Sequence, residues 1–222
     1  MQKYLTIILC FVHIAVFGQF NTKIGYTGTY SNYDQFNSLL QQYNDTRSNL
    51  VDKFPKVRFL HGLDLGMRYH FGGGFIAEGG INFGQSPNVK STGIDPGDVF
   101  FDDKWTMKYS DYHISASTMI GSMSIGSSIN YGTITFSTDA ANSSRFKDVA
   151  MSKQWSTNVF LNFEVASKGI SFALRPFVRI PLTSYSVEGI AQELRVASPA
   201  SNVDKSLGFG LSFLFFNGKS YR

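Results

Sequence analysis

The sequence SLGFGLSFLFF at residues 206–216 decides the fold class of this chain. Bulky apolar side chains occupy the odd positions from Leu207 to Phe215, whereas serine or glycine occupies the even positions from Ser206 to Ser212. Successive side chains of a β-strand point to opposite faces. A period of two therefore predicts a strand with one apolar face and one face of small or polar residues.

The same alternation recurs along the chain and predicts eight strands. We expect them at residues 22–30, 57–71, 75–85, 104–120, 123–137, 154–166, 169–186 and 205–217. Three connections are short (Gly72-Gly73-Gly74, Gly121-Ser122 and Ser167-Lys168), and they alternate with four long ones. Tight turns on one side and long loops on the other are typical of outer-membrane barrels. The sequence therefore predicts an all-β fold, an eight-stranded antiparallel up-and-down transmembrane β-barrel.

The three-glycine turn predicts the register of one hairpin. A turn at residues 72–74 pairs Phe71 with Phe75 and Arg68 with Glu78. This register keeps apolar residues opposite one another and places opposite charges together. We therefore expect Arg68 and Glu78 to face each other inside the barrel, where each charge stabilises the other.

The charged residues of the predicted strands share a face with glycine, serine and asparagine. They are Asp64, Arg68, Glu78, Glu164, Arg175 and Arg179. Because eight strands enclose only enough space for side chains, we interpret them as a structural ion network that fills the lumen, and the apolar face as the surface that meets lipid. A proton or ion path through the same charges is the alternative. A soluble barrel of the lipocalin or avidin type would carry its charges on the opposite face.

Aromatic residues fall mostly toward the strand ends, where membrane barrels carry aromatic girdles at the two interfaces. They are Tyr26, Tyr30, Phe59, Tyr69, Tyr109, Tyr112, Tyr131 and Trp155. Aromatic residues make up 15% of the chain and charged residues 16%, which suits aromatic-rich strands rather than a helical enzyme.

The first 18 residues have the features of a signal peptide. Lys3 supplies a positive start, an apolar stretch follows at residues 4–17, and small Gly18 precedes a cleavage site before Gln19. We expect residues 1–18 to be removed and residues 19–222 to form the barrel in the bacterial outer membrane. A permanent helical anchor is the alternative. Cys10, the single cysteine, lies in this segment, so the mature chain would have no thiol.

The first long loop contains apolar residues at helical spacing. They are Phe36, Leu39, Leu40 and Tyr43, with polar residues between them. This pattern predicts a short amphipathic helix that lies as a lid across the barrel mouth or the outer leaflet. Docking onto another envelope protein is the alternative use of the same apolar face.

The second long loop is acidic, with Asp95, Asp98, Asp102 and Asp103. Calcium favours such oxygen ligands, but their spacing matches no known calcium loop. We interpret this loop as solvated, with calcium binding as the alternative.

The histidines that follow the signal peptide do not converge in the predicted barrel. His61 falls on the lipid-facing side, His70 beside the glycine turn, and His113 on the lumenal side. A serine–histidine–acid site needs all three groups within hydrogen-bond reach. We therefore expect no catalytic residue, no cofactor and no metal ligand. The net charge of +4, without a lysine or arginine run, argues against nucleic acid as a partner.

Two segments carry a family resemblance. Within residues 206–213, Ser206, Gly208, Leu211 and Phe213 resemble the outer-membrane assembly signal, although the chain continues past its terminal aromatic residue. The mature chain resembles small barrels of the OmpA and OmpX type, and FNSLLQQYN at residues 36–44 is similar to a poorly characterised outer-membrane β-barrel family of gliding-type bacteria. The resemblance implies outer-membrane lipid and the assembly machinery as partners, with a larger envelope complex as a further candidate.

These observations favour a non-enzymatic outer-membrane β-barrel with a structural or accessory role, which presents four long loops to partners in the envelope. The alternative is an adhesin or another surface protein that binds an external ligand. A lipid-modifying enzyme and a pore are further hypotheses that the sequence favours less.

Overall fold

A computed structural model describes residues 20–94, 99–139, 146–166, 169–199 and 201–217 of the chain. The proposed signal peptide, 1–18, lies outside the described residues, as do the turn at Ser167-Lys168 and the loop residues Asp95 and Asp98.

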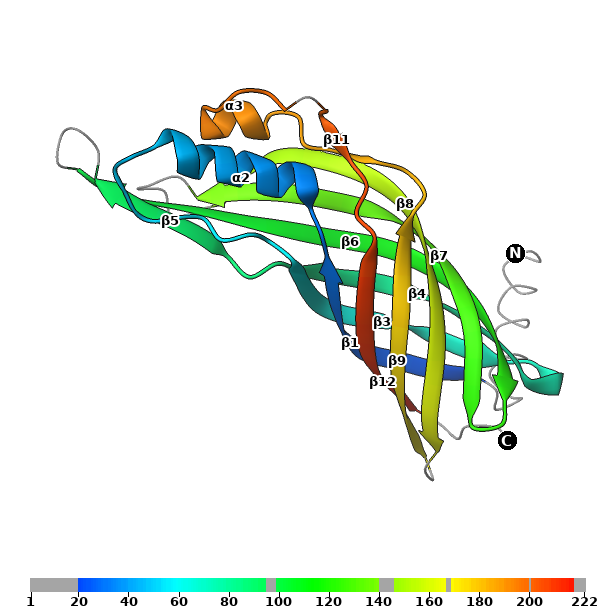
Figure 1. The fold of residues 1–222 in the computed structure, drawn as a ribbon. Coiled ribbons are helices and arrows are strands. Elements are labelled where there is room, and N and C mark those ends of the chain that lie inside the picture. The colour runs from blue at the N-terminus through cyan, green and yellow to red at the C-terminus, as the bar shows by residue number, and fades with distance from the viewer. Residues whose placement is uncertain (1–19, 95–98, 140–145, 167–168, 200, 218–222) are drawn as a thin grey trace, which may run out of the picture.

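Eight antiparallel strands form a closed barrel, as the sequence predicted (Figure 1). They are β1 (Phe20–Ser31), β3 (Phe59–His70), β4 (Phe75–Gln85), β6 (Phe100–Ile120), β7 (Met123–Asp139), β8 (Lys147–Ala166), β9 (Ile170–Pro181) and β12 (Gly208–Asn217). Each strand pairs with its neighbours in sequence, and β1 pairs with β12 to close the ring.

The remaining elements lie beyond the end of the barrel that is opposite the turn at Gly72–Gly74. They are α2 (Asp34–Thr46), β2 (Leu50–Asp52), β5 (Val89–Ile94), β10 (Tyr185–Ser186), α3 (Ile190–Leu194) and β11 (Val203–Asp204). A single 3-10 turn, η1 (Gly72–Gly74), joins β3 to β4. Among the described residues no helix is long and apolar enough to cross a membrane.

The hairpin at η1 has the predicted register. Arg68 is the Cα partner of Glu78, and the backbone N–H of Phe71 donates to the carbonyl of Phe75 at 2.8 Å. Gly73 and Gly74 have φ angles of 78° and 81°, a backbone region that glycine adopts without steric cost. The three-glycine sequence is therefore what allows this tight turn.

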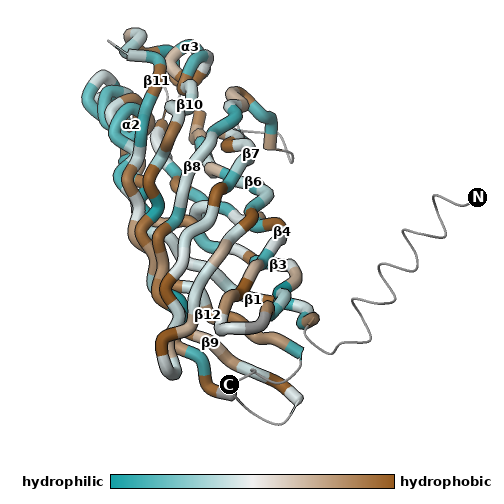
Figure 2. The backbone as a smooth tube through the Cα atoms, turned by 90° about the vertical axis from the view of Figure 1, so that its right-hand side faces the viewer, coloured by the Kyte–Doolittle hydropathy of each residue, from teal (hydrophilic) through white to brown (hydrophobic). Residues whose placement is uncertain are grey.

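Hydrophobic and hydrophilic residues alternate along the barrel strands (Figure 2). Large apolar residues of the odd positions of β12, such as Phe209 and Phe213, are exposed on the outer surface, while Ser212 is buried inside. Of the aromatic residues assigned to the girdles, Tyr109 does not face outward. It lies on the inner face of β6 and is only 7% exposed, so its assignment to a girdle was wrong.

Three strands continue far beyond the barrel and form an extension that we call the arm. It consists of β2, β5 and the ends of β6, β7 and β8 at residues 100–108, 134–139 and 147–153. β8 begins at Lys147, not at the predicted residue 154, because its end keeps a hydrogen-bonded neighbour in β7. β9 instead ends at Pro181, not at residue 186, where the chain turns back and the N–H of Leu182 donates to the carbonyl of Trp155.

Candidate functional site

The six charged residues assigned to the lumen all lie inside the barrel and take part in ion pairs. Asp64 binds Lys23 (3.0 Å), Arg68 binds Glu164 (2.7 Å), Glu78 binds Arg175 (2.6 Å), and Arg179 binds Asp111 (3.0 Å). Lys23 also lies 3.3 Å from Glu78, which links two of the pairs. The network therefore contains four cationic and four anionic side chains, and their charges cancel.

The ion pairs of Arg68 and Glu78 cross the lumen and do not follow the hairpin. Although Arg68 and Glu78 are Cα partners, Arg68 reaches from β3 to Glu164 on β8, and Glu78 reaches from β4 to Arg175 on β9. The expected direct pair of Arg68 with Glu78 is thus not the one that forms. In so narrow a barrel, long side chains meet the opposite wall as readily as a neighbouring strand, so register alone does not determine their partners.

Sequence reasoning did not single out Lys23 and Asp111. Lys23 is 1% exposed on β1, and Asp111 is 1% exposed on β6. Both occupy the same parity as the other lumenal residues of their strands, and Asp111 lies two positions from His113, which was assigned to the lumen. Extending the parity argument to every charged residue would have identified both.

Aromatic rings pack against the guanidinium groups of the network. Arg68 lies 3.5 Å from the ring centroid of Phe216, and Arg175 lies 4.3 Å from that of Phe160. Phe216, Leu214 and Ala173 form a small buried cluster near the end of the barrel that carries η1. Apolar and cation–π contacts therefore close this end of the lumen.

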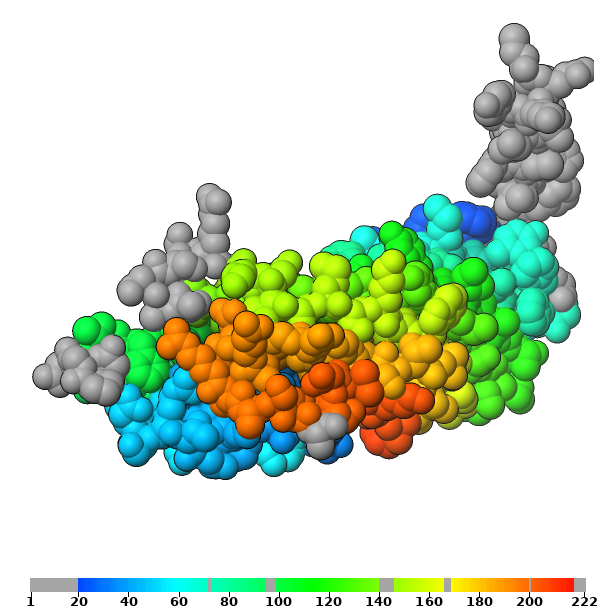
Figure 3. All heavy atoms as spheres, turned by 90° about the horizontal axis from the view of Figure 1, so that it is seen from above, coloured from blue at the N-terminus to red at the C-terminus, as the bar shows by residue number. Residues whose placement is uncertain are grey.

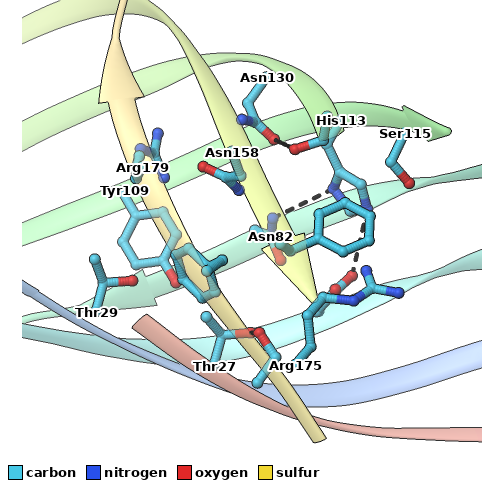
Figure 4. Close-up of a pocket in the computed structure, with 15 residues that line it drawn as sticks. Thr27, Thr29, Asn82, Tyr109, His113, Ser115, Asn130, Asn158, Arg175 and Arg179 are labelled. Atoms are coloured by element: carbon cyan, nitrogen blue, oxygen red, sulfur yellow. Dashed lines mark hydrogen bonds and ion pairs between the residues drawn. The ribbon is translucent and has the colours of Figure 1, made fainter. Parts of the chain in front are cut away.

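A small polar cavity remains within the ion network, whose residues Asp64, Arg175 and Arg179 help to line it (Figure 4). Side chains that include Thr27, Asn82, His113, Asn130 and Arg175 point into it. Its volume is about 30 Å³, which is room for one or two water molecules and not for a permeating solute. The geometry suits a filled lumen better than a water-filled channel.

The inner face turns from polar to apolar toward the end of the barrel that is opposite η1. On β6, Asp111 and His113 are followed upward by buried Tyr109, Met107 and Trp105. On β7, Asn130 gives way to buried Ile134 and Phe136 in the same direction. The inward-facing residues of β6 and β7 thus become apolar at this end and form a surface on which the loops pack.

The loops form a cover over this surface that we call the cap, comprising residues 32–49, 53–58, 182–199 and 201–206 with α2 and α3. The four residues predicted to form the helical face, Phe36, Leu39, Leu40 and Tyr43, are all buried. The ring centroid of Phe36 lies 4.8 Å from that of Phe136 and 6.0 Å from that of Trp105. The predicted helix therefore packs on the inner side of the arm. Seen from above, residues of α2 and of the 185–205 region lie against each other (Figure 3).

Two asparagines of α2 hold the returning chain. Asn37 donates to the carbonyl of Val57 (2.8 Å) and accepts from its N–H (2.7 Å). Asn44 makes the same pair of bonds with Phe54, at 2.9 Å each. These residues look like part of a solvated polar face in the sequence, but both are buried. Both lie beside Leu40 on the helix, three and four residues away, so they border the apolar face, and this position is the signal that could have identified them.

A buried carboxylate joins the first loop to the last. Asp204 Oδ2 accepts hydrogen bonds from the hydroxyl of Tyr185 (2.8 Å) and from the backbone N–H of Gln35 in the first turn of α2 (3.0 Å). A negative charge at the N-terminus of α2 also interacts favourably with the helix dipole. Burial raises the pKa of Tyr185, and the Asp204 carboxylate raises it further, so this tyrosine stays neutral as a donor.

The acidic loop residues that the structure describes have protein partners. Asp103 accepts a hydrogen bond from Tyr43 at 2.7 Å, and Asp102 forms an ion pair with Lys104 at 3.1 Å. Among the described residues no group of three or more histidine, cysteine, aspartate or glutamate side chains is arranged to hold a metal ion.

The three histidines among the described residues lie in different surroundings. His61 is on the outer face, with its ring against Tyr26 and Phe59, whereas His70 and His113 are buried inside. His113 Nε2 lies 2.9 Å from Lys23 Nζ. Within the described part of the chain, the hydrogen bonds of His113 do not assemble a nucleophile, a base and an acid.

The residues of the proposed assembly signal occupy the last strand and its approach. Ser206 precedes β12 and lies 3.3 Å from the hydroxyl of Tyr185, while Gly208 faces inward. Leu211 and Phe213 are exposed on the outer face. This placement leaves two apolar side chains of the signal on the outer surface.

Comparison with known proteins finds solved structures of similar fold. No model of a protein family matches the sequence, and no curated protein matches it. The crystal structure of Ail, the attachment invasion locus protein of Yersinia pestis, is similar with a TM-score of 0.49 and 11% identity over 90% of this chain and 97% of that chain. The crystal structure of Ail in complex with the heparin analogue sucrose octasulfate is similar with a TM-score of 0.46 and 9% identity over 90% of this chain and 98% of that chain. The crystal structure of the outer membrane protein OprG from Pseudomonas aeruginosa is similar with a TM-score of 0.42 and 13% identity over 91% of this chain and 97% of that chain.

Proposed function

We propose that this chain is a non-enzymatic, non-conducting barrel of the bacterial outer membrane, with an accessory role in which its folded cap and arm contact another envelope protein. The observation that carries the proposal is the charge-balanced lumenal network beneath a packed cap. A pore or transporter needs a wet path, whereas this lumen is filled with paired side chains. What remains for function is the surface that stands outside the membrane.

The outer wall supports the membrane location. Residues such as Ile24, Ile114, Val165 and Phe215 are more than half exposed on the barrel exterior, a distribution that lipid stabilises and water does not. Export through a cleaved signal peptide and insertion by the outer-membrane assembly machinery accompany this proposal. The partners are then membrane lipid and the assembly machinery, in addition to an envelope protein.

The end of the arm supports a protein partner. Val51, Ile94, Val99 and Phe100 are 69%, 47%, 56% and 63% exposed, and Ile94 is the Cα partner of Phe100. Apolar side chains gathered at the end of a rigid extension mark an interaction site more often than an ordinary surface.

Purification from native outer membranes in mild detergent tests the accessory role. We expect a companion protein in fixed ratio with the wild type and its loss with Phe100→Asp, while Lys56→Ala, an exposed change in the cap, retains it. Absence of any companion from the wild type would contradict the accessory role.

An adhesin is the second candidate, because the same exposed apolar residues lie on the part of the chain directed away from the membrane. Its test is binding of intact cells to immobilised host or matrix material. Adhesion that Phe100→Asp abolishes, without an envelope companion, would favour the adhesin.

A further inference from the structure

A groove on the outer wall lies on the extracellular side of the row that contains Tyr112, Tyr131 and Trp155. It has a volume of about 530 Å³, and the strands that line it are β1, β3, β4, β6 and β7. Its lining side chains form two successive cross-strand rows. The first row is Leu63, Phe83, Ser110 and Thr133, and the second, one step toward the extracellular end, is His61, Gln85, Lys108 and Thr135.

The row below the groove is aromatic. Tyr112, Tyr131 and Trp155 are neighbours across β6, β7 and β8, and the ring centroids of Tyr131 and Trp155 lie 4.6 Å apart. Such rows lie at the boundary between hydrocarbon and headgroups. The groove therefore opens at headgroup level, with Leu63 and Phe83 on its membrane side and hydroxyl and amino groups above them.

The charge of the groove is positive. Lys108 lines it, and no aspartate or glutamate belongs to its lining. Lys153 on β8 is the Cα partner of Thr133 and faces the same side of the sheet. Within the ranges that the structure describes, neither Lys108 nor Lys153 forms an ion pair, and the amino group of Lys108 lies 5.9 Å from the ring centroid of Phe146.

We propose that this groove binds the phosphate headgroup of an anionic membrane lipid. Lys108 supplies the charge, and the hydroxyls of Ser110, Thr133 and Thr135 supply donors for phosphate oxygens. The acyl chains of the same molecule run down past Leu63 and Phe83. An amphipathic anion satisfies both halves of the groove, whereas a soluble anion leaves the apolar half exposed to water. The inference rests on the membrane location proposed above.

Lipid binding to the detergent-solubilised, folded full chain tests this site. Native mass spectrometry with phosphatidylglycerol and, separately, zwitterionic phosphatidylcholine reports the affinity for each lipid. We expect Lys108→Ala to weaken phosphatidylglycerol binding about tenfold, the loss expected for one charge-assisted contact, and to leave phosphatidylcholine unchanged. Lys108→Arg should retain the preference, and Lys56→Ala, which removes an exposed charge elsewhere, should match the wild type. Millimolar inorganic phosphate should not displace the lipid.

Two outcomes would overturn the inference. Equal binding of the two lipids by the wild type, or equal behaviour of Lys108→Ala and Lys56→Ala, removes the site while leaving the barrel in the membrane. Failure of the wild type to insert into lipid vesicles contradicts the membrane location as well. The shift in gel mobility between unheated and boiled samples shows for every variant that the barrel is folded.

Discussion

Glu78 and Arg175 meet across the lumen, with Oε1 of the carboxylate 2.6 Å from Nη2 of the guanidinium and Oε2 2.9 Å from Nη1. One residue comes from β4 and the other from β9, so the contact joins opposite walls of the barrel. Both side chains are almost fully buried. A two-point ion pair in this position fixes the distance between the walls as well as satisfying the charges.

Breaking this pair should destabilise the barrel. Glu78→Ala leaves Arg175 and Lys23 without their shared carboxylate, and we expect a loss on the order of 3 kcal/mol in the free energy of unfolding. In a double-mutant cycle measured by urea unfolding in lipid vesicles, Glu78→Ala and Arg175→Ala should be coupled by more than about 1 kcal/mol. The matched cycle of Glu78→Ala with Arg68→Ala should show weaker coupling. The reverse order would mean that the hairpin pair, and not the cross-lumen pair, is the one that forms in the membrane.

The outer wall can be tested with the two tryptophans of the chain. Trp155 is 45% exposed on the barrel exterior, whereas Trp105 is 2% exposed beneath the cap. In vesicles that contain brominated lipid, the fluorescence of Trp105→Phe, which retains Trp155, should be strongly quenched. The fluorescence of Trp155→Phe should be nearly unaffected. Quenching of neither variant would place the apolar face away from lipid.

We call the hydrogen-bond pairs of Asn37 with Val57 and of Asn44 with Phe54 the asparagine clamps. Breaking a clamp should destabilise the cap and leave the barrel folded. Asn37→Ala leaves the N–H and carbonyl of Val57 without their partners, and we expect a local cost of about 1–3 kcal/mol. Amide hydrogen exchange at Val57 and trypsin cleavage at Lys53 and Lys56 should both accelerate. Ser38→Ala, a change at an exposed position of the same helix, is the control and should leave both rates unchanged. Unaltered exchange in Asn37→Ala would show that the clamp does not hold the cap.

The stability of the cap should fall in alkaline solution. Because burial raises the pKa of Tyr185 above its ordinary value of 10.0, the folded state holds a proton that the unfolded state releases at lower pH. This contribution is complete below about pH 10 and is lost progressively as the pH rises above it. Urea unfolding followed through Trp105 in Trp155→Phe should therefore show stability declining from about pH 10 upward. Adding Tyr185→Phe should make the decline shallower, and an unchanged slope would assign the effect to other groups.

The barrel could be predicted from sequence because the patterns that specify its strands and turns lie within short segments of the chain. The period of two assigns each residue of β12 or β4 to a face, and the glycine turn sets the register of Arg68 with Glu78. The partners of long lumenal side chains depend on the width and closure of the barrel, which no single strand contains. For this reason the register of the hairpin was confirmed while its expected ion pair was not.

The cap was predictable only in part. The helical spacing of Phe36, Leu39 and Leu40 predicted α2, but its packing surface comes from inward positions of β6 and β7 far along the chain. Tyr109 was assigned to a girdle because an aromatic residue near a strand end suits both an interface and a cap core. The neighbours Met107 and Trp105, which continue the inward parity, distinguish the two cases.

The length of β6 has a mechanical consequence. Its 21 residues extend roughly 70 Å at about 3.3 Å per residue, although a tilted strand needs only about 9–11 residues to cross the hydrocarbon layer. In the membrane location proposed above, about half of this one continuous strand stands outside the bilayer, braced by β5 and β7 and by the packed core of the cap. A molecule bound at the end of the arm is joined to the bilayer by one continuous strand that has no flexible connection along its length. Its height and its angle to the membrane are set by the tilt of the barrel, and a pull on it is transmitted directly to the wall that the lumenal ion pairs hold together.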